Sequence, residues 1–464
     1  MSNTNNFIFR IGFVPIYFDL YDDWGKEIRE AFIPMVKCIK ELVKGEGVLI
    51  ESKTVSNISE SEEMADFFID EKVDIVVTLH LVYSPSMIIA DSIKRIRKPV
   101  IILDTSLVKT FKNMDSNFLM QNHALPGIQD LSSVLRSKSV KYSVIVGYYK
   151  DKSFQNELKR KLLLFKAARS FHNQRIGITG KPFKQMGDFE ISKSEMRSLF
   201  SAKVIDINNE SILKEEDKIN EKDINKIFDN DKDLYVSDEI REIDHKASIR
   251  TYIALKTIIK DKALDAYTMN FREIKGFPVP FYAISKLMME GYGYAGEGDV
   301  LTALLGKPLN ILSKKAMFGE FFSSDWDSEL MIVSHMGETN PEFSKRGTKI
   351  ILKPKTLYKY YSASIYFKFS LEPCVLTFIT IIKGLNGGRE LLTGIVKVED
   401  LQPYEAFDAP HFIIKTSEGI NRFREKYCLS GGGHHLYFAM GNIVKDLKEL
   451  SNYLDIPCND INDI

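Results

Sequence analysis

The sequence predicts an α/β protein: two Rossmann-like domains built on parallel sheets, followed by a β-rich, antiparallel, barrel-like C-terminal domain. Short apolar runs alternate with longer amphipathic runs, and this alternation starts again near residue 175. Beyond residue 315, segments rich in β-branched and aromatic residues follow one another instead. A chain of 464 residues is also too long for one ordinary core. We therefore expect domains at 1–172, 173–315 and 316–464.

The first third has the pattern of right-handed βαβ units on a parallel sheet. Each short apolar run predicts a strand, and each run with apolar residues at helical spacing predicts a helix. The expected strands are 7–17, 48–50, 74–79, 99–103 and 142–147, and the expected helices are 25–44, 62–69, 86–97 and 152–170.

The middle third repeats this pattern. Strands are expected at 175–180, 202–205, 234–236 and 266–269, and helices at 244–259 and 298–306. The segment 208–233 is rich in charges of both signs, which fits either a solvated helix or an inserted loop.

The last third predicts antiparallel strands at 350–352, 363–369, 375–382 and 391–398. The pair Asn386 and Gly387 between the last two is a strong hairpin signal. A helix is expected at 441–453.

Composition excludes several classes of protein. The formal net charge is zero, so no overall field favours nucleic acid or an anionic membrane. No apolar run approaches the roughly 20 residues that span a bilayer, and the first residues do not resemble a signal peptide. Four cysteines (Cys38, Cys374, Cys428 and Cys458) lie far apart, which fits a reducing compartment. We expect a cytoplasmic protein.

Three segments carry residues suited to chemistry. Residues 291–299, GYGYAGEGD, form a glycine-rich turn that places Glu297 and Asp299 at the edge of a strand or helix. The simpler interpretation is a loop with exposed acids. A phosphate-binding loop is a poorer fit, because neither known glycine spacing is present and carboxylates repel phosphate.

The second segment, residues 317–341, ends an apolar strand-like run at His335, with Glu320, Asp325 and Glu338 near it in the sequence. A lone histidine at such a place is more often a hydrogen-bonding residue than a ligand. In the third segment, SGGGHHL at 430–436, glycines precede the pair His434 and His435. Neighbouring side chains on a strand point to opposite faces, so at most one would normally bind a given metal.

The three segments together favour a divalent metal. The chain has only eight histidines, and three of them lie in these segments. Carboxylates and imidazoles without thiolates favour a hard or borderline ion, with Mn²⁺ the first choice and Co²⁺ or Mg²⁺ possible. Four protein ligands would leave positions open for substrate oxygens, as in a catalytic site.

In order and spacing, these segments resemble the L-arabinose isomerase group of the arabinose/fucose isomerase superfamily. The resemblance implies four metal ligands: Glu297 in GEGD, Glu320 in FGEFF, His335 in SHMGE and His435 in GGGHH. More faintly, TLHLVYSPS at 78–86 and VGYYKD at 146–151 resemble segments of the family's N-terminal part.

The sequence departs from the family at places that contact the sugar. Where the family has a glutamine at the end of the first strand, Phe18 stands at about that place. The family's NQTAHGG segment is replaced by NHALPGIQD, so His123 is shifted and Pro126 lies near the expected position. These changes replace polar groups that bind sugar and leave the implied metal ligands intact.

The family interconverts an aldose and a ketose, and the resemblance implies the same for this chain. Glu297 and Glu320 would be the catalytic acid and base as well as ligands. His434 would orient the substrate or help to open its ring, and we also expect Met336, Phe271, Phe18 and His123 to contact it. The family implies a homotrimer or homohexamer in which a neighbour's N-terminal domain closes each pocket.

The leading hypothesis is a metal-dependent aldose–ketose isomerase that acts on a pentose, deoxyhexose or related sugar through an enediol. The departures at Phe18 and in NHALPG keep a second reaction open, such as epimerisation of a modified sugar or another enolisation. A third hypothesis is a non-catalytic sugar-binding protein, because doubly wound α/β domains also form such binders.

Overall fold

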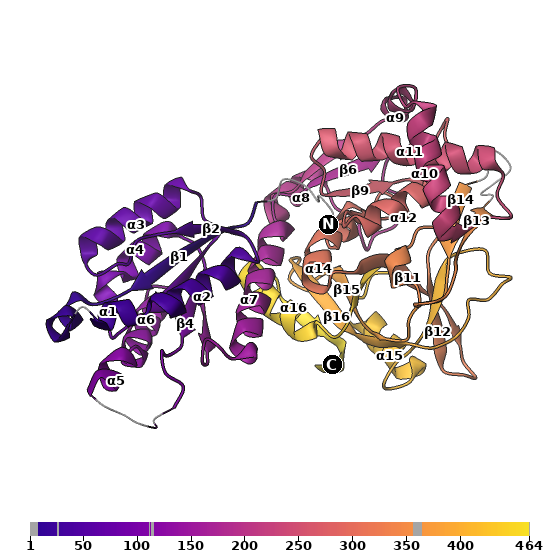
Figure 1. Ribbon diagram of the computed structural model, residues 1–464. Coiled ribbons are helices and arrows are strands. Elements are labelled where there is room, and N and C mark those ends of the chain that lie inside the picture. The colour runs from indigo at the N-terminus through magenta and orange to yellow at the C-terminus, as the bar shows by residue number, and fades with distance from the viewer. Residues whose placement is uncertain (1–7, 26, 111, 113–115, 356–363, 464) are drawn as a thin grey trace. The chain divides into compact units, whose positions relative to one another are not determined.

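The computed structural model describes residues 8–25, 27–110, 112, 116–355 and 364–463. The chain divides into two compact units, one formed by Phe7–Arg169 and one that contains Ser170–Ile464 (Figure 1). This division falls close to the expected boundary at 172. The expected boundary at 315 lies inside the second unit and stays a prediction.

The first unit is built on a five-stranded parallel sheet in the order β2-β1-β3-β4-β5. Its strands are β1 (Arg10–Ile16), β2 (Val48–Glu51), β3 (Ile75–His80), β4 (Val100–Asp104) and β5 (Tyr142–Val146). Its helices are α1 (Glu27–Ala31), α2 (Ile33–Lys44), α3 (Ile58–Asp70), α4 (Ala90–Ile96), α5 (Ser116–Gln121), α6 (Leu125–Ser137) and α7 (Lys152–Phe171), with 3-10 turns η1 (Asp19–Trp24) and η2 (Ser86–Ile88). The predicted Rossmann-like arrangement is confirmed.

Two expected helices of this unit are divided. The pattern at 25–44 forms α1 and then α2, and Pro34 lies in the first turn of α2. Proline lacks an amide hydrogen, so it suits a helix start and interrupts a continuous helix. The pattern at 86–97 begins as the 3-10 turn η2 and becomes helical only at Ala90. Residue 7 of the expected first strand lies outside the described residues.

The second unit begins with a four-stranded parallel sheet in the order β10-β9-β6-β7. Its strands are β6 (Arg175–Thr179), β7 (Lys203–Asp206), β9 (Ala266–Met269) and β10 (Gly293–Ala295). The associated helices are α8 (Lys193–Phe200), α9 (Asn209–Glu216), α10 (Glu221–Leu234), α11 (Glu242–Asp261), α12 (Phe281–Met289), α13 (Val300–Ala303) and α14 (Gly306–Ser313), with the turn η3 (Phe271–Glu273).

The charged segment 208–233 forms helices rather than a loop. Asn208 accepts a hydrogen bond from the amide of Ser211, and Asn220 accepts one from the amide of Asp223. Each asparagine therefore caps the start of a helix, α9 or α10. The expected strand 234–236 does not join the parallel sheet. As β8 (Tyr235–Val236) it pairs with β13 instead. The sequence pattern of a short strand predicts the strand but does not specify its partner.

The C-terminal part contains a closed antiparallel barrel of six strands in the order β15-β18-β11-β12-β17-β16, and pairing of β15 with β16 closes it. These strands are β11 (Ala316–Asp325), β12 (Leu330–Ser334), β15 (Val375–Lys383), β16 (Arg389–Val398), β17 (His411–Lys415) and β18 (Leu436–Met440). The remaining elements are α15 (Ile420–Leu429), α16 (Val444–Leu454), β19 (Cys458–Asp460), which runs parallel to β16, and the turns η4 (Pro341–Phe343) and η5 (Ile461–Asp463). The predicted barrel-like β domain is confirmed.

Two expected strands lie outside this barrel. The patterns at 350–352 and 363–369 correspond to β13 (Ile350–Lys355) and β14 (Ser364–Lys368), which form a separate sheet with β8. Residue 363 lies outside the described residues. The hairpin signal at Asn386 and Gly387 is confirmed, because residues 384–388 connect β15 to β16 and Gly387 has a φ of 76°.

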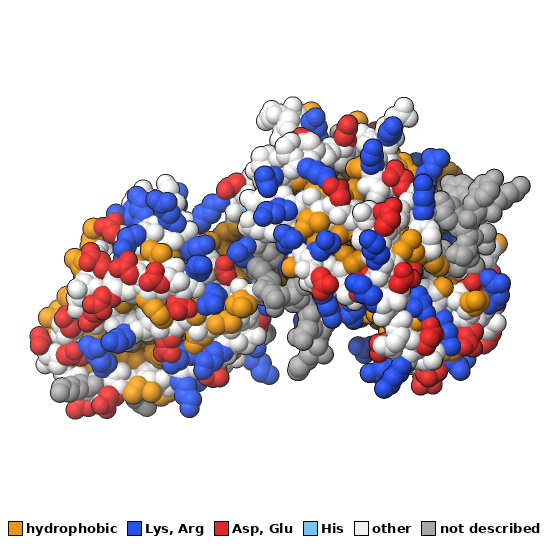
Figure 2. All heavy atoms as spheres, turned by 90° about the horizontal axis from the view of Figure 1, so that it is seen from above, with side chains coloured by type: hydrophobic (Ala, Val, Ile, Leu, Met, Phe, Trp, Pro, Cys, Tyr) orange, Lys and Arg blue, Asp and Glu red, His pale blue; other side chains and the backbone are white. Residues whose placement is uncertain are grey.

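The surface agrees with the even charge balance. Acidic and basic side chains both occur across the face of each unit that Figure 2 shows. Within the described part of the chain, no helix is both long and apolar enough to cross a bilayer.

A buried histidine gives the first unit a specific response to pH. His80 ends β3, is 1% exposed, and its Nδ1 has no hydrogen-bond partner among the described residues. Burial lowers the pKa of His80 to about 4, against a smaller opposing effect of Asp130. The unfolded chain therefore binds a proton near pH 6.5, and the folded chain binds it only near pH 4.

We predict that this histidine costs the protein about 2 kcal/mol of stability between pH 7 and pH 5, because unfolding becomes coupled to proton uptake. The free energy of unfolding keeps its full value above pH 6.5 and decreases as the pH falls toward 4. Urea unfolding of the wild type and of His80→Leu at both pH values measures it. Equal pH dependence in the two proteins would contradict this assignment.

Candidate metal centre

The GYGYAGEGD segment places Glu297 at the carboxyl end of the central parallel sheet. β10 ends at Ala295, whose carbonyl accepts a hydrogen bond from the hydroxyl of Thr268. Glu297 then takes a left-handed backbone conformation with a φ of 61°, which is uncommon for a residue other than glycine. The surrounding backbone holds it there, because the amide of Phe183 donates to its carbonyl. Such a retained conformation is typical of functional sites.

The first glycine of this turn makes room for His335. A Cβ atom on Gly296 would lie 2.5 Å from Cε1 and 3.2 Å from Nε2 of the His335 ring, and 3.3 Å from a carboxylate oxygen of Glu338. Any larger residue here would therefore displace the imidazole, so this glycine allows the turn and the barrel strand to approach each other.

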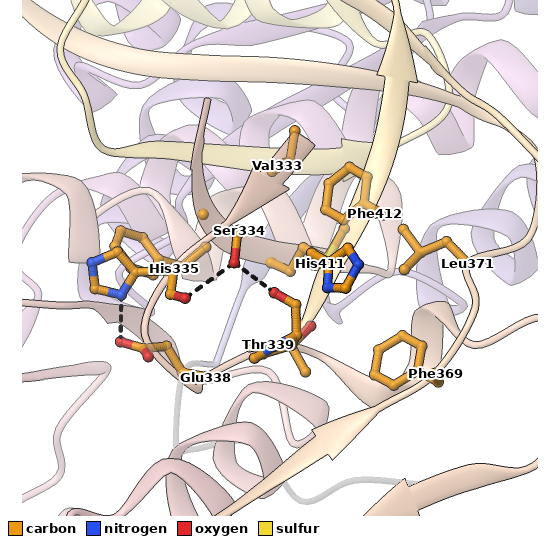
Figure 3. Close-up of a pocket in the computed structure, with 13 residues that line it drawn as sticks. Val333, Ser334, His335, Glu338, Thr339, Phe369, Leu371, His411 and Phe412 are labelled. Atoms are coloured by element: carbon orange, nitrogen blue, oxygen red, sulfur yellow. Dashed lines mark hydrogen bonds and ion pairs between the residues drawn. The ribbon is translucent and has the colours of Figure 1, made fainter. Parts of the chain in front are cut away.

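His335 directly follows β12, and the carboxylate of Glu338 fixes its ring. Its Nδ1 lies 3.0 Å from Oε1 of Glu338 (Figure 3). The same Oε1 also accepts from the hydroxyl of Tyr294, and Oε2 accepts from the amide of Gly337. Burial alone would raise the pKa of Glu338, but the charge and hydrogen bond of His335 outweigh it and lower the pKa to about 2. The ionised carboxylate holds the Nδ1 proton, so Nε2 is the nitrogen that could coordinate an ion, in exchange for any proton that it carries.

A small cavity lies behind His335, against Phe369 and His411 (Figure 3). Its volume is about 10 Å³. A space of this size holds about one water molecule. It cannot hold a sugar.

His435 is held in the same manner as His335. It immediately precedes β18, and its Nδ1 lies 2.9 Å from Oδ2 of Asp299, which also caps α13 by accepting from the amide of Thr302. Phe189 stacks on the His435 ring at 5.1 Å between centroids. Burial is the main cause that lowers the pKa of His435. Its Nε2 faces Oε2 of Glu297 at 3.7 Å.

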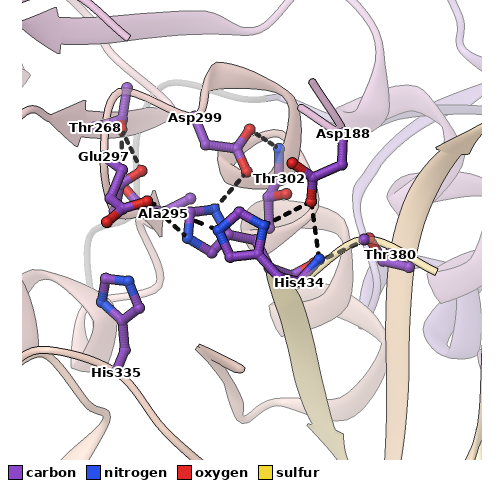
Figure 4. Close-up of polar contacts among 12 residues, drawn as sticks. Asp188, Thr268, Ala295, Glu297, Asp299, Thr302, His335, Thr380 and His434 are labelled. Carbon is purple, nitrogen blue, oxygen red and sulfur yellow. Dashed lines mark hydrogen bonds and ion pairs between the residues drawn. The ribbon is translucent and has the colours of Figure 1, made fainter. Parts of the chain in front are cut away.

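His434 has its own carboxylate partner, Asp188, from the segment between β6 and α8 (Figure 4). Oδ2 of Asp188 lies 2.6 Å from Nδ1 of His434, and Nε2 of His434 lies 3.7 Å from Oε2 of Glu297. Burial would lower the pKa of His434, but its hydrogen bond to Asp188 and the nearby carboxylate of Glu297 outweigh this effect and raise the pKa to about 10.

The three side chains of Glu297, His434 and His435 form a group that could hold a cation. One ligand atom from each lies within 4.8 Å of the others. Oε2 of Glu297 and Nε2 of His435 are buried and have no hydrogen-bond partner within the described part of the chain. Two buried acceptors that face each other without a donor between them fit a bound positive ion.

The other two expected ligands lie beside this group and are not part of it. The His335 ring is 5.3 Å from the His435 ring between centroids. Glu320, half-buried on β11, pairs across the sheet with Ser334, the residue before His335. Its charge contributes to the raised pKa values of His335 and His434, which indicates that it lies near both.

The residues expected to contact substrate fall in both units. Met336 directly follows His335 and is half-buried. Phe271 is buried and packs on Phe183, whose amide contacts Glu297. Phe18 and His123 belong to the first unit, where His123 pairs with the hydroxyl of Tyr21 at 2.7 Å. Their contact with the candidate centre stays a prediction.

Sequence reasoning missed the three carboxylates that orient the histidines. Asp299 and Glu338 were apparent only as nearby acids, and Asp188 was not singled out at all. A carboxylate beside a ligand histidine is a recurring arrangement, and Glu338, three residues after His335, gave a local signal for it. Asp188 gave none, because it meets His434 only through the fold.

Several known proteins have sequences similar to this chain. A family model described as the L-arabinose isomerase central domain matches residues 179–315. L-arabinose isomerase 2 of Clostridium acetobutylicum is 23% identical over 83% of this chain and 82% of its own length. L-arabinose isomerase of Halalkalibacterium halodurans is 23% identical over 85% and 82%, and L-arabinose isomerase 2 of Bacillus licheniformis is 26% identical over 61% and 63%. The chain is a divergent L-arabinose isomerase-like protein.

Proposed function

We propose that this protein is a metal-dependent aldose–ketose isomerase that acts on a pentose, deoxyhexose or related sugar through an enediol. The observation that carries the proposal is the unpartnered pair formed by Oε2 of Glu297 and Nε2 of His435, buried and 3.7 Å apart. Proteins similar to this chain over most of its length are named L-arabinose isomerases, which supports assignment to the sugar isomerases.

We assign Glu297, Glu320, His335 and His435 as the metal ligands. His335 and His435 each have Nδ1 bound to a carboxylate, so Nε2 of each is free to coordinate. Glu320 makes no hydrogen bond or ion pair with the residues that the structure describes, so its carboxylate is free to turn toward an ion. Oxygen and imidazole ligands suit Mn²⁺ first, then Co²⁺ or Mg²⁺.

His434 is assigned to the substrate rather than to the metal. Its side chain is 37% exposed, whereas that of His435 is 2% exposed. His434 therefore lies on the side of the centre from which a sugar can enter, and its Nε2 faces the Glu297 carboxylate.

The reaction moves one hydrogen from C2 to C1 of the open-chain sugar and one proton from the C2 hydroxyl to the C1 oxygen. The ion, when bound, supplies a positive charge that stabilises the developing enediolate. A carboxylate of Glu297 or Glu320 removes the C2 proton and returns it to C1, as general base and then general acid. His434 donates a hydrogen bond to a substrate oxygen and holds the sugar in place.

We further propose a homotrimer or a homohexamer, in which the first unit of a neighbour brings Phe18 and His123 to the sugar. The replacement of polar groups at these positions would then select a sugar other than the one for which the relatives are named.

Glu297→Gln should lower the isomerisation rate by at least about 100-fold, because general acid–base catalysis by a carboxylate contributes that much. A panel of aldoses assayed with Mn²⁺, with ketose products quantified, measures it. Glu210→Gln makes the same chemical change on the exposed start of α9 and should not alter the rate. An epimer as the only product would replace isomerisation by the second reaction, and sugar binding without turnover by the wild type would favour a binding protein.

Glu338→Gln should weaken Mn²⁺ binding by about 10–100-fold, because the loss of a carboxylate that orients a ligand histidine typically costs that much. Isothermal titration of metal-free protein measures the affinity. The control is Glu342→Gln, whose carboxylate makes no hydrogen bond to the described residues. Equal affinity of wild type and Glu338→Gln would remove His335 from the proposed ligands.

A further inference from the structure

The loop between β6 and α8, residues 180–192, brings several contacts together at the candidate centre. The amide of Phe183 donates to the carbonyl of Glu297, and the ring of Phe189 stacks on His435 with an angle of 3° between the planes. Pro182 lies against Gly298, where a Cβ atom would come within 2.6 Å of it. This loop therefore contacts both the GEGD turn and the GGGHH turn, which are far apart in the sequence.

Within this loop, Asp188 holds His434 at two points. Its Oδ2 accepts from the backbone amide of His434 at 2.9 Å and lies 2.6 Å from Nδ1 of the same residue. Gly433 lets the turn come this close, because a Cβ atom on it would lie 3.3 Å from Oδ2 of Asp188. Figure 4 shows Asp188 and His434 turned toward each other.

The double contact fixes which edge of the imidazole faces the centre. A carboxylate can only accept, so Nδ1 must carry the proton that it shares with Asp188. Nδ1 is thus directed at Asp188 while Nε2 points to Oε2 of Glu297, 3.7 Å away. Without Asp188, rotation about the Cβ–Cγ bond would exchange the two edges.

We propose that Asp188 is a positioning residue that holds the imidazole of His434 with Nε2 toward the substrate position beside Glu297. This inference rests on the proposed function, since it gives His434 its task as the donor that orients a substrate oxygen. Asp188 itself does not touch the sugar and acts only through His434.

The first test observes the imidazole directly and needs no substrate. Long-range proton–nitrogen NMR spectra of protein with labelled histidines report the proton position in each ring, and loss of one set of signals in His434→Gln assigns His434. Asp188→Asn keeps the shape of the side chain but removes its charge, so the Nδ1 and Nε2 signals of His434 should shift. Glu190→Gln, two residues away and exposed, is the matched control and should leave them in place. Unchanged His434 signals in Asp188→Asn would overturn the proposal.

The second test separates positioning from a general structural role. Asp188→Asn should lower kcat by about 10–100-fold, the usual loss when an orienting carboxylate is removed, with Mn²⁺ affinity unchanged. In a His434→Gln background the same substitution should have no further effect on kcat. Additive losses in the double variant, or a loss of Mn²⁺ binding in Asp188→Asn alone, would mean that Asp188 supports the turn as a whole, and would overturn the proposal.

The two tests also separate this inference from the proposed function. A wild type inactive on every aldose would defeat the isomerase assignment, and the NMR comparison would still decide whether Asp188 fixes His434.

Discussion

The centre depends on a pair of buried acceptors that are held face to face without a donor between them. Leaving one buried polar atom unsatisfied costs about 1–3 kcal/mol, and Glu297 and His435 each have such an atom. No hydrogen bond among the described residues removes this cost, because Nδ1 rather than Nε2 of His435 is bound to Asp299 and the nearest nitrogen to Oε2 of Glu297, Nε2 of His434, lies 3.7 Å away. The nearby imidazoles reduce it through their charge, which outweighs the effect of burial and lowers the pKa of Glu297. In our account, a divalent ion bound by these two atoms offsets the cost, because the described part of the folded chain supplies no hydrogen-bond donor to either of them.

Each orienting carboxylate comes from a different part of the second unit. Asp299 caps the short helix that follows the GEGD turn, Glu338 lies in the turn after β12, and Asp188 lies in the loop after β6. The centre therefore lies where the carboxyl end of the parallel sheet meets strands of the barrel. A carboxylate–imidazole pair fixes both the direction of the ring and the nitrogen that carries the proton. His335, His434 and His435 need this control, because small rotations would direct the wrong atom toward an ion or a sugar.

Local patterns in the sequence predicted the features that depend on local structure. Alternating strands and helices predicted both parallel sheets, and dense β-branched and aromatic segments predicted the barrel. Contacts between distant parts of the chain decided which strands pair with one another. β8 has an ordinary strand pattern but joins β13, and β13 and β14 form a sheet outside the barrel. Asp188 could not be predicted, because its contact with His434 joins residues 246 positions apart. The combination of three segments predicted a metal site, and the resemblance to the L-arabinose isomerase group indicated Glu297 and His435 as ligands, whereas the contacts of Asp299 and Glu338 with the histidines required distances.

The most direct test of the account is to locate the ion. Crystals grown with Mn²⁺ and measured at the manganese absorption edge would show by anomalous scattering where it binds. The account predicts one strong peak within coordination distance of Oε2 of Glu297 and Nε2 of both His335 and His435, with the Glu320 carboxylate turned toward it. A peak at another place, or none beside Glu297 and His435 under conditions that saturate the protein with Mn²⁺, would contradict the central claim.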